Sequence, residues 1–189
     1  MKIGIDISQT AYQGTGVANY TKNLTLALLR IDKKNEYILF FSSLRKKCPV
    51  VVSGFPNASL RTFKFPPTIL DFIWNRLHIL PIEWLIGDID VFFSSDWLQQ
   101  PVIKARKVTT VHDLIALKYP EETHPTIEFR IRNFIISPNI VEIQKRRLMW
   151  VKKEADLVIC DSQATKKDVM EILKIDEKRL RTIYPGGTL

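Results

Sequence analysis

The stretch from Lys2 to Ile31 reads KIGIDISQTAYQGTGVANYTKNLTLALLRI, and its first seven residues have the composition of a β-strand. A loop with two glycines follows, at Gly14 and Gly16. From Val17 onward, apolar residues return at steps of three and four, which predicts a helix with one apolar face. The chain therefore opens with a strand, a glycine loop and a helix.

The same alternation continues along the chain. Further strands are predicted at 37–42, 59–65, 90–95, 107–112, 156–160 and 181–184. Helices are predicted at 69–84, 126–154 and 163–173, and the second must break or kink at Pro138. Alternating strands and helices predict an α/β fold, a Rossmann-like parallel sheet with helices on both faces. Such sheets bind ligands beyond the carboxyl ends of their strands, so we expect a site in the loops after Ser8, Ser95, His112 and Cys160.

Length and composition indicate one globular domain. The chain has 189 residues, and 46% of them are hydrophobic and 25% charged. A domain of this size can bury a core without disulfides or metals to support it.

Several features favour a cytoplasmic protein. Cys48 and Cys160 are far apart and lack metal or redox spacing, and Cys160 ends an apolar run, which predicts a buried thiol. Asp6 interrupts the apolar core that a signal peptide would need. The most apolar long window, 66–87, contains charged residues and Pro81, so it does not resemble a transmembrane span.

The net charge of +8 is compatible with three kinds of partner: nucleic acid, an anionic membrane surface, or anionic small molecules. The basic residues form no recognised nucleic-acid motif, so we expect no nucleic acid. Seven of them lie on the stretch 126–154, among aromatic residues: Arg130, Arg132, Lys145, Arg146, Arg147, Lys152 and Lys153. This pattern fits either a solvated face or peripheral contact with the inner face of an anionic membrane.

The loop 9–16 lies where phosphates bind in α/β proteins. Gly16 opens a helix, so free N–H groups and the positive end of the helix dipole could face an anion. The loop is neither a dinucleotide fingerprint, because Asn19 stands where the third glycine belongs, nor a P-loop. A plain turn before a helix is the alternative.

His112 and Asp113 come at the end of a predicted strand. His112 could donate a hydrogen bond to a sugar hydroxyl or a phosphate oxygen, or it could be a structural residue at the strand end. Trp97, which follows the strand at 90–95 after Asp96, could stack on a sugar ring, although packing at the rim is favoured.

Glu121, Glu122 and His124 match no metal-ligand spacing, and a solvated loop is the favoured interpretation. We therefore expect no metal and no cofactor.

Four segments together resemble the N-terminal domain of the group 1, or family 4, glycosyltransferases, which have the two-domain GT-B architecture. They are IGID at 3–6 with GTGVANYT at 14–21; IWN at 73–75 with LP at 80–81 and DVFFSS at 90–95; TVHDL at 110–114 with PE at 120–121; and ADLVICDS at 155–162 with IYPGG at 183–187. The resemblance covers nearly the whole chain and keeps the family's order. One departure is Trp74-Asn75, where the family often has Trp-Glu. The role that the glutamate has in the family is therefore not carried over to Asn75.

The resemblance implies that residues 1–189 are the acceptor-side, Rossmann-like half of a retaining glycosyltransferase. The donor-binding C-terminal domain would be absent from this chain, so we expect the chain to fold alone without transferring sugar. By resemblance, His112 contacts the transferred sugar from a nucleotide-sugar donor. Gly14, Thr15, Gly16, Asp113 and Ser162 would lie near the donor diphosphate or the acceptor, which could be a glycan, a lipid-linked sugar or a small molecule. The alternative is a non-catalytic Rossmann-like binding module that uses its basic face on a membrane or protein partner.

Overall fold

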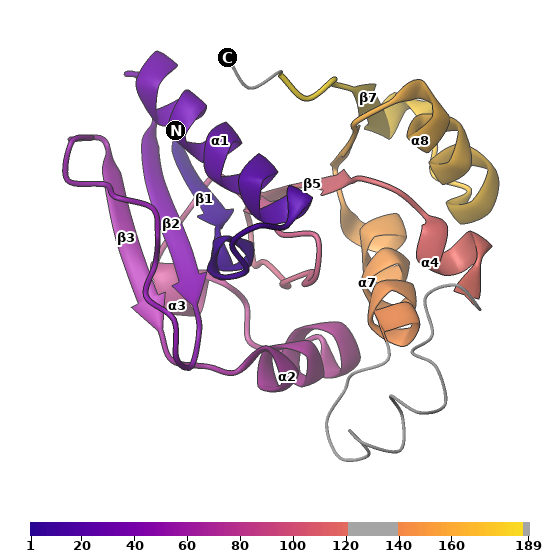
Figure 1. Ribbon diagram of the computed structural model, residues 1–189, viewed down its shortest axis with the longest axis horizontal. Helices are drawn as coiled ribbons and strands as arrows, with labels where there is room; N and C mark the ends of the chain where they lie inside the picture. The colour runs from indigo at the N-terminus through magenta and orange to yellow at the C-terminus, as the bar shows by residue number, and fades with distance from the viewer. Residues whose placement is uncertain (121–139, 187–189) are drawn as a thin grey trace.

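Seven parallel strands form one sheet in the computed structural model, which describes residues 1–120 and 140–186 (Figure 1). The strands are β1 (Lys2–Asp6), β2 (Glu36–Ser42), β3 (Ala58–Phe63), β4 (Val91–Ser94), β5 (Arg106–Val111), β6 (Leu157–Cys160) and β7 (Leu180–Thr182). The predicted parallel sheet and all seven predicted strands are confirmed. The last strand begins and ends earlier than the predicted 181–184.

The order of strands across the sheet is β3-β2-β1-β4-β5-β6-β7. The chain therefore starts in the middle of the sheet, adds β2 and β3 on one side, and then returns to the other side of β1 with β4. This reversal opens a crevice at the carboxyl ends of β1 and β4, where open α/β sheets bind their ligands.

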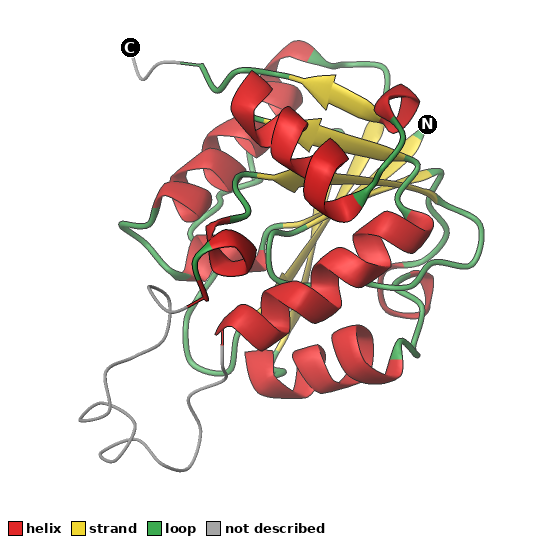
Figure 2. Cartoon of the chain, turned by 90° about the vertical axis from the view of Figure 1, so that its right-hand side faces the viewer, coloured by secondary structure: helices red, strands yellow, loops and turns green. Residues whose placement is uncertain are grey.

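The helices are α1 (Gly16–Ile31), α2 (Pro67–Leu70), η2 (Asp71–Leu77), α3 (Glu83–Ile86), α4 (Ile115–Lys118), α7 (Ile140–Glu154), α8 (Gln163–Asp168) and η3 (Val169–Leu173), with short 3-10 turns at η1 (Ser8–Ala11) and η4 (Glu177–Arg179). They lie on both faces of the sheet (Figure 2). Beyond the arrowheads of β2 and β3 lies α2, at the carboxyl edge (Figure 1).

The prediction of one helix over 69–84 is wrong. The helical stretch ends at Leu77, because His78 and Leu80 take left-handed backbone conformations with φ of 54° and 65°. The Trp74 indole N–H donates to the Leu80 carbonyl at 2.9 Å and so fixes the reversal of the chain. A separate turn, α3, begins only at Glu83. The apolar spacing through this region thus belongs to two short elements.

Alternate residues of β2 pack on opposite faces of the sheet. Leu39 and Phe41 belong to a core cluster that includes residues of α1, whereas Phe40 packs with Trp74 of η2 and with α3 on the other face. On β1, a Cβ at Gly4 would lie 2.9 Å from side-chain atoms of Ile86 and Phe92. Glycine at this position therefore permits the close packing of α3 on the sheet.

A third core cluster joins α7, η3 and strands β5 to β7, and it contains Cys160, which is fully buried as predicted. Burial raises the pKa of its thiol to about 11. The predicted helical residues 126–139, the kink at Pro138 and the loop residues Glu121, Glu122 and His124 lie outside the described residues.

Candidate functional site

The glycine loop ends in an open helix start. Thr15 caps α1, since its Oγ1 accepts a hydrogen bond from the Ala18 N–H at 3.2 Å. Gly14 has a φ of 90°, a conformation that favours glycine. In the part of the chain described, the N–H groups of Gly16 and Val17 have no acceptor, as is usual in a first turn. This turn therefore offers two free donors and the positive end of a helix that is 16 residues long.

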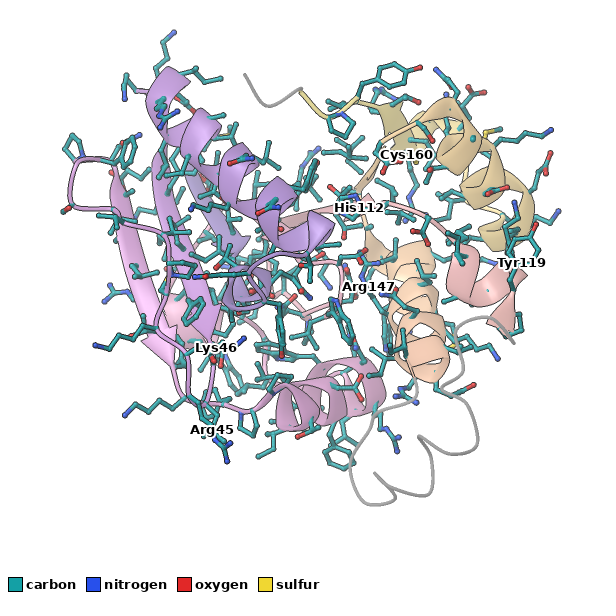
Figure 3. The ribbon with its side chains drawn as sticks, in the orientation of Figure 1. Arg45, Lys46, His112, Tyr119, Arg147 and Cys160 are labelled. Atoms are coloured by element: carbon teal, nitrogen blue, oxygen red, sulfur yellow. The ribbon has the colours of Figure 1, made fainter. Side chains whose placement is uncertain are left out.

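His112 follows β5 and is held from three sides. Its Nδ1 lies 3.5 Å from Oδ2 of Asp161, and its ring meets the Tyr20 ring edge-to-face at 4.7 Å between centroids. The His112 carbonyl accepts a hydrogen bond from the Thr165 hydroxyl at 2.8 Å, and the Tyr20 hydroxyl lies 3.3 Å from Oγ1 of Thr110. These contacts fix the imidazole at the carboxyl edge of the sheet (Figure 3).

A hollow of about 1000 Å³ lies between α1 and the C-terminal residues 183–186, and we call it the histidine hollow. Its lining includes His112, Gly16, Val17 and Tyr20. The predicted proximity of Gly16 and His112 is therefore present in the structure. A ligand in this hollow could meet the imidazole and the open helix start together.

A second hollow, of about 600 Å³, lies between the glycine loop and η2, and we call it the apolar hollow. Its lining includes Tyr12, Thr15 and Val17 from the loop side, and Leu70 and Phe72 from α2 and η2. Val17 lines both hollows. The two hollows therefore lie on either side of the first turn of α1.

Arg147 joins three elements at the floor of this region. Although only 1% of its side chain is exposed, its guanidinium contacts Asp96 Oδ1 at 3.1 Å, Thr109 Oγ1 at 2.9 Å and the Thr110 carbonyl at 2.8 Å. Burial raises the pKa of the Asp96 carboxyl, while the charges of Arg147 and His112 oppose the rise. Figure 3 shows Arg147 reaching from α7 toward the side of the sheet on which His112 lies.

The structure corrects the prediction that all seven basic residues of 126–154 belong to one basic face, because the Arg147 side chain points into the protein instead of into solvent. Its spacing from Ile143 and Val151, which are both buried, could have shown this, since the three positions share one stripe of α7. Arg146 is also drawn inward and contacts Asp71 at 3.2 Å. Arg130 and Arg132 lie outside the described residues. The lysines at 145, 152 and 153 remain exposed.

Asp6 is another carboxyl at this edge, and it is fully buried. It ends β1 and accepts hydrogen bonds from the Ser8 N–H at 2.9 Å and from Gln100 Nε2 at 2.7 Å. No ion-pair partner for it is found in the described ranges. Burial raises its pKa, and the hydrogen bonds from Ser8, Gln100 and Ser95 counter part of that rise.

Of the other predicted residues, Asp113, Ser162 and Gly14 line neither hollow. Asp113 accepts a hydrogen bond from the Ile115 N–H at 3.0 Å, and Ser162 caps α8 by accepting from the Thr165 N–H at 3.0 Å. Gly14 lies in the exposed turn that precedes α1. Trp97, for which rim packing was favoured, lines the apolar hollow and also packs against a core cluster.

The described residues contain no group of three or more His, Cys, Asp or Glu side chains arranged to hold a metal ion. Within 1–120 and 140–186, every helix is too short or too polar to cross a lipid bilayer.

Comparison with known families gives one match, and it covers most of the chain. The family described as Glycosyltransferase Family 4 matches residues 14–187, a range that includes the glycine loop, His112 and Ser162. A search among curated proteins gave no match.

Proposed function

The chain belongs to glycosyltransferase family 4, and from this we propose that it is the acceptor-side domain of a retaining transferase that takes its sugar from a nucleotide-sugar donor. The observation that carries the proposal is the meeting of two hollows at the first turn of α1, with His112 in one of them. A transferase needs a place for each substrate and a shared point where the sugar passes between them.

The open turn at Gly16 and Val17 suits the donor diphosphate. Negative charge accumulates on the diphosphate as the bond to the sugar breaks, and preorganised N–H donors stabilise such charge. The positive end of α1 adds to this effect without any metal ion. We propose that the nucleotide itself is held by groups outside residues 1–189.

We assign His112 to the transferred sugar. Because Nδ1 faces Asp161, Nε2 is the ring nitrogen available for a sugar hydroxyl or a phosphate oxygen in the histidine hollow. Asp161 and Tyr20 would act as positioning residues that hold the ring in one orientation. Geometry of this kind contributes to rate by fixing the reacting groups before the reaction begins.

The test compares two histidines in the protein at its natural length. His78 is a matched control, because it also contacts a carboxylate, Glu154 at 3.0 Å, but pairs through it with Lys107 at the amino end of β5. We expect His112→Ala to lower sugar transfer about 100-fold, in line with the loss of one well-placed donor. His78→Ala should lower the melting temperature and leave transfer close to that of the wild type.

A panel of nucleotide sugars, with released nucleotide as the readout, would identify the donor first. Equal loss of transfer and of melting temperature in His112→Ala would make His112 a structural residue. Absence of transfer with every donor would favour the alternative of a non-catalytic binding module.

A further inference from the structure

We infer that the apolar hollow takes an acceptor whose sugar or alcohol group is attached to an apolar chain. The inference rests on the proposed function, and it names the class of acceptor for that same site. It starts from what the hollow offers to a ligand.

The described lining of the apolar hollow is poor in charge. Among the described residues that line this hollow, the charged residues are Asp71 and Arg76. Asp71 is already engaged, since its Oδ1 accepts from Asn75 Nδ2 at 2.9 Å and its Oδ2 contacts Arg146 at 3.2 Å. A polar glycan bound here would therefore find few free charged partners.

The hydroxyl groups at the floor are engaged as well. Ser8 Oγ accepts from the Ser42 N–H at 2.9 Å. Ser42 Oγ donates to the Phe65 carbonyl at 3.0 Å and accepts from the Phe65 N–H at 3.2 Å. Because these two hydroxyls are bonded to backbone groups, the surface left for a ligand is mainly that of apolar side chains such as Val17 and Leu70.

The hollow adjoins the histidine hollow on its glycine-loop side, and its lining from η2 is apolar and exposed. At one end, Thr15 and Val17 adjoin the histidine hollow, where the donor sugar is proposed to lie. At the other, Phe72 lines the hollow and is 51% exposed, and Ile69, one turn earlier on the same helical stretch, is 47% exposed. An acceptor with a hydroxyl near Thr15 and a chain leading past Phe72 matches both ends.

The size of the hollow fits this class of ligand. A volume of about 600 Å³ lies within the ~300–1,000 Å³ range of ordinary small-molecule sites. Each methylene group buried in such a site strengthens binding about fourfold, the factor that corresponds to ~0.8 kcal/mol. The affinity should therefore depend on chain length until the hollow is filled.

The experiment measures calorimetric binding of butyl, hexyl and octyl glucoside to the protein, all below their micelle concentrations. We expect the affinity to rise about fourfold per methylene. Phe72→Ser should weaken octyl glucoside binding about tenfold and change butyl glucoside binding little. Ile103→Ser is the matched control, because Ile103 is 55% exposed and lies in the loop before β5, outside both hollows. It should bind the whole series as the wild type does.

A second variant guards against an effect on folding. Thr68→Trp, at an exposed position in the lining, should fill the hollow and abolish the dependence on chain length while circular dichroism stays unchanged. Equal affinity for all three glucosides, or equal effects of Phe72→Ser and Ile103→Ser, would overturn the inference.

Sugar transfer distinguishes this inference from the proposed function. If kcat/KM is the same for glucose and octyl glucoside as acceptors, the acceptor class is wrong and the transferase proposal stands. If the glucosides bind in the expected series but no nucleotide sugar gives transfer, the transferase proposal fails and the ligand class of the hollow stands.

Discussion

Replacing Asp6 by Asn should stabilise the protein at neutral pH, because it removes a buried charge that has no positive partner among residues 1–120 and 140–186. Asp6 is fully buried and accepts hydrogen bonds from the Ser8 N–H and Gln100 Nε2, and the side chains of Ser8 and Ser95 are further hydrogen-bonding neighbours. The variant can keep the bonds to the Ser8 N–H and to Gln100. Asn Oδ1 accepts from Ser8, and Asn Nδ2 donates to Gln100 once the Gln100 amide turns over, since Gln100 Oε1 has no partner in the described part of the chain.

The size of the effect follows from two opposing contributions. Desolvating a buried ion costs several kcal/mol even after the protein relaxes. Charge-assisted hydrogen bonds, here from Ser8, Gln100 and Ser95, are each stronger than neutral ones by ~1 kcal/mol, and this advantage is lost in the variant. Because the pKa of Asp6 is raised in spite of these bonds, desolvation is the larger effect, and we expect Asp6→Asn to be more stable by about 1–2 kcal/mol. For a chain of this length, each kcal/mol raises the melting temperature by roughly 2–4 °C.

The stability difference between Asp6→Asn and the wild type should depend on pH, and the direction of the pKa shift of Asp6 determines how. Burial raises the folded-state pKa of Asp6 above its ordinary value of 3.8, so folding favours the protonated form. The stability from this group is fully present below the unfolded-state pKa and is lost as the pH rises through the folded-state pKa. The advantage of Asp6→Asn over the wild type should therefore be small in acid and grow toward neutral pH.

Urea unfolding of both proteins across a pH series measures this difference directly. All other titratable groups are common to the two proteins and cancel. Asp88→Asn, at an exposed position, is the control and should show no such trend. A wild type that is more stable than Asp6→Asn at neutral pH, or a difference that does not change with pH, would refute the reasoning.

Two further predictions concern α7. Arg147→Leu should lower stability by ~2–4 kcal/mol, because it leaves the Asp96 carboxylate, which is only 17% exposed, without its cation. Arg147→Leu combined with Asp96→Asn should lose much less stability, and equal losses in denaturant titrations would contradict an ion pair between them. The exposed lysines, Lys145, Lys152 and Lys153, should give weak binding to anionic vesicles that falls as salt shortens the Debye length below ~8 Å, and sedimentation that is indifferent to salt would argue against a membrane role.

The central strands could be predicted because they are short runs rich in apolar and β-branched residues, as in β2 (EYILFFS) and β4 (VFFS), which pair within a sheet covered on both faces. The prediction of one helix over 69–84 relied on apolar spacing, which does not reveal the left-handed backbone at His78 and Leu80. Neither residue is a glycine, but Pro81 directly follows Leu80, and this helix breaker was the signal in the sequence that the stretch is divided there. The hydrogen bond from Trp74 to the Leu80 carbonyl, which fixes this turn, depends on tertiary packing.

The site was predictable in part. The glycine loop and His112 could be located from their places after strands β1 and β5, and both line the histidine hollow. The carboxylate that faces His112, Asp161, follows a different strand, and the Asp6–Gln100 hydrogen bond joins the end of β1 to a loop after β4. Such pairings depend on the order of strands in the sheet, which alternation alone does not determine.

The central place of β1 has a consequence for how the chain folds during synthesis. β1 pairs with β2 and β2 with β3, so this half of the sheet can assemble once Phe63 has left the ribosome. The other edge of β1 pairs with β4, and Ile3 has no partner there until Val91 has been made. An unpaired strand edge can associate with other chains. The nascent protein is therefore most exposed to aggregation while residues 64–90 are being translated, and α3, which packs against Gly4, is the last element made in that interval.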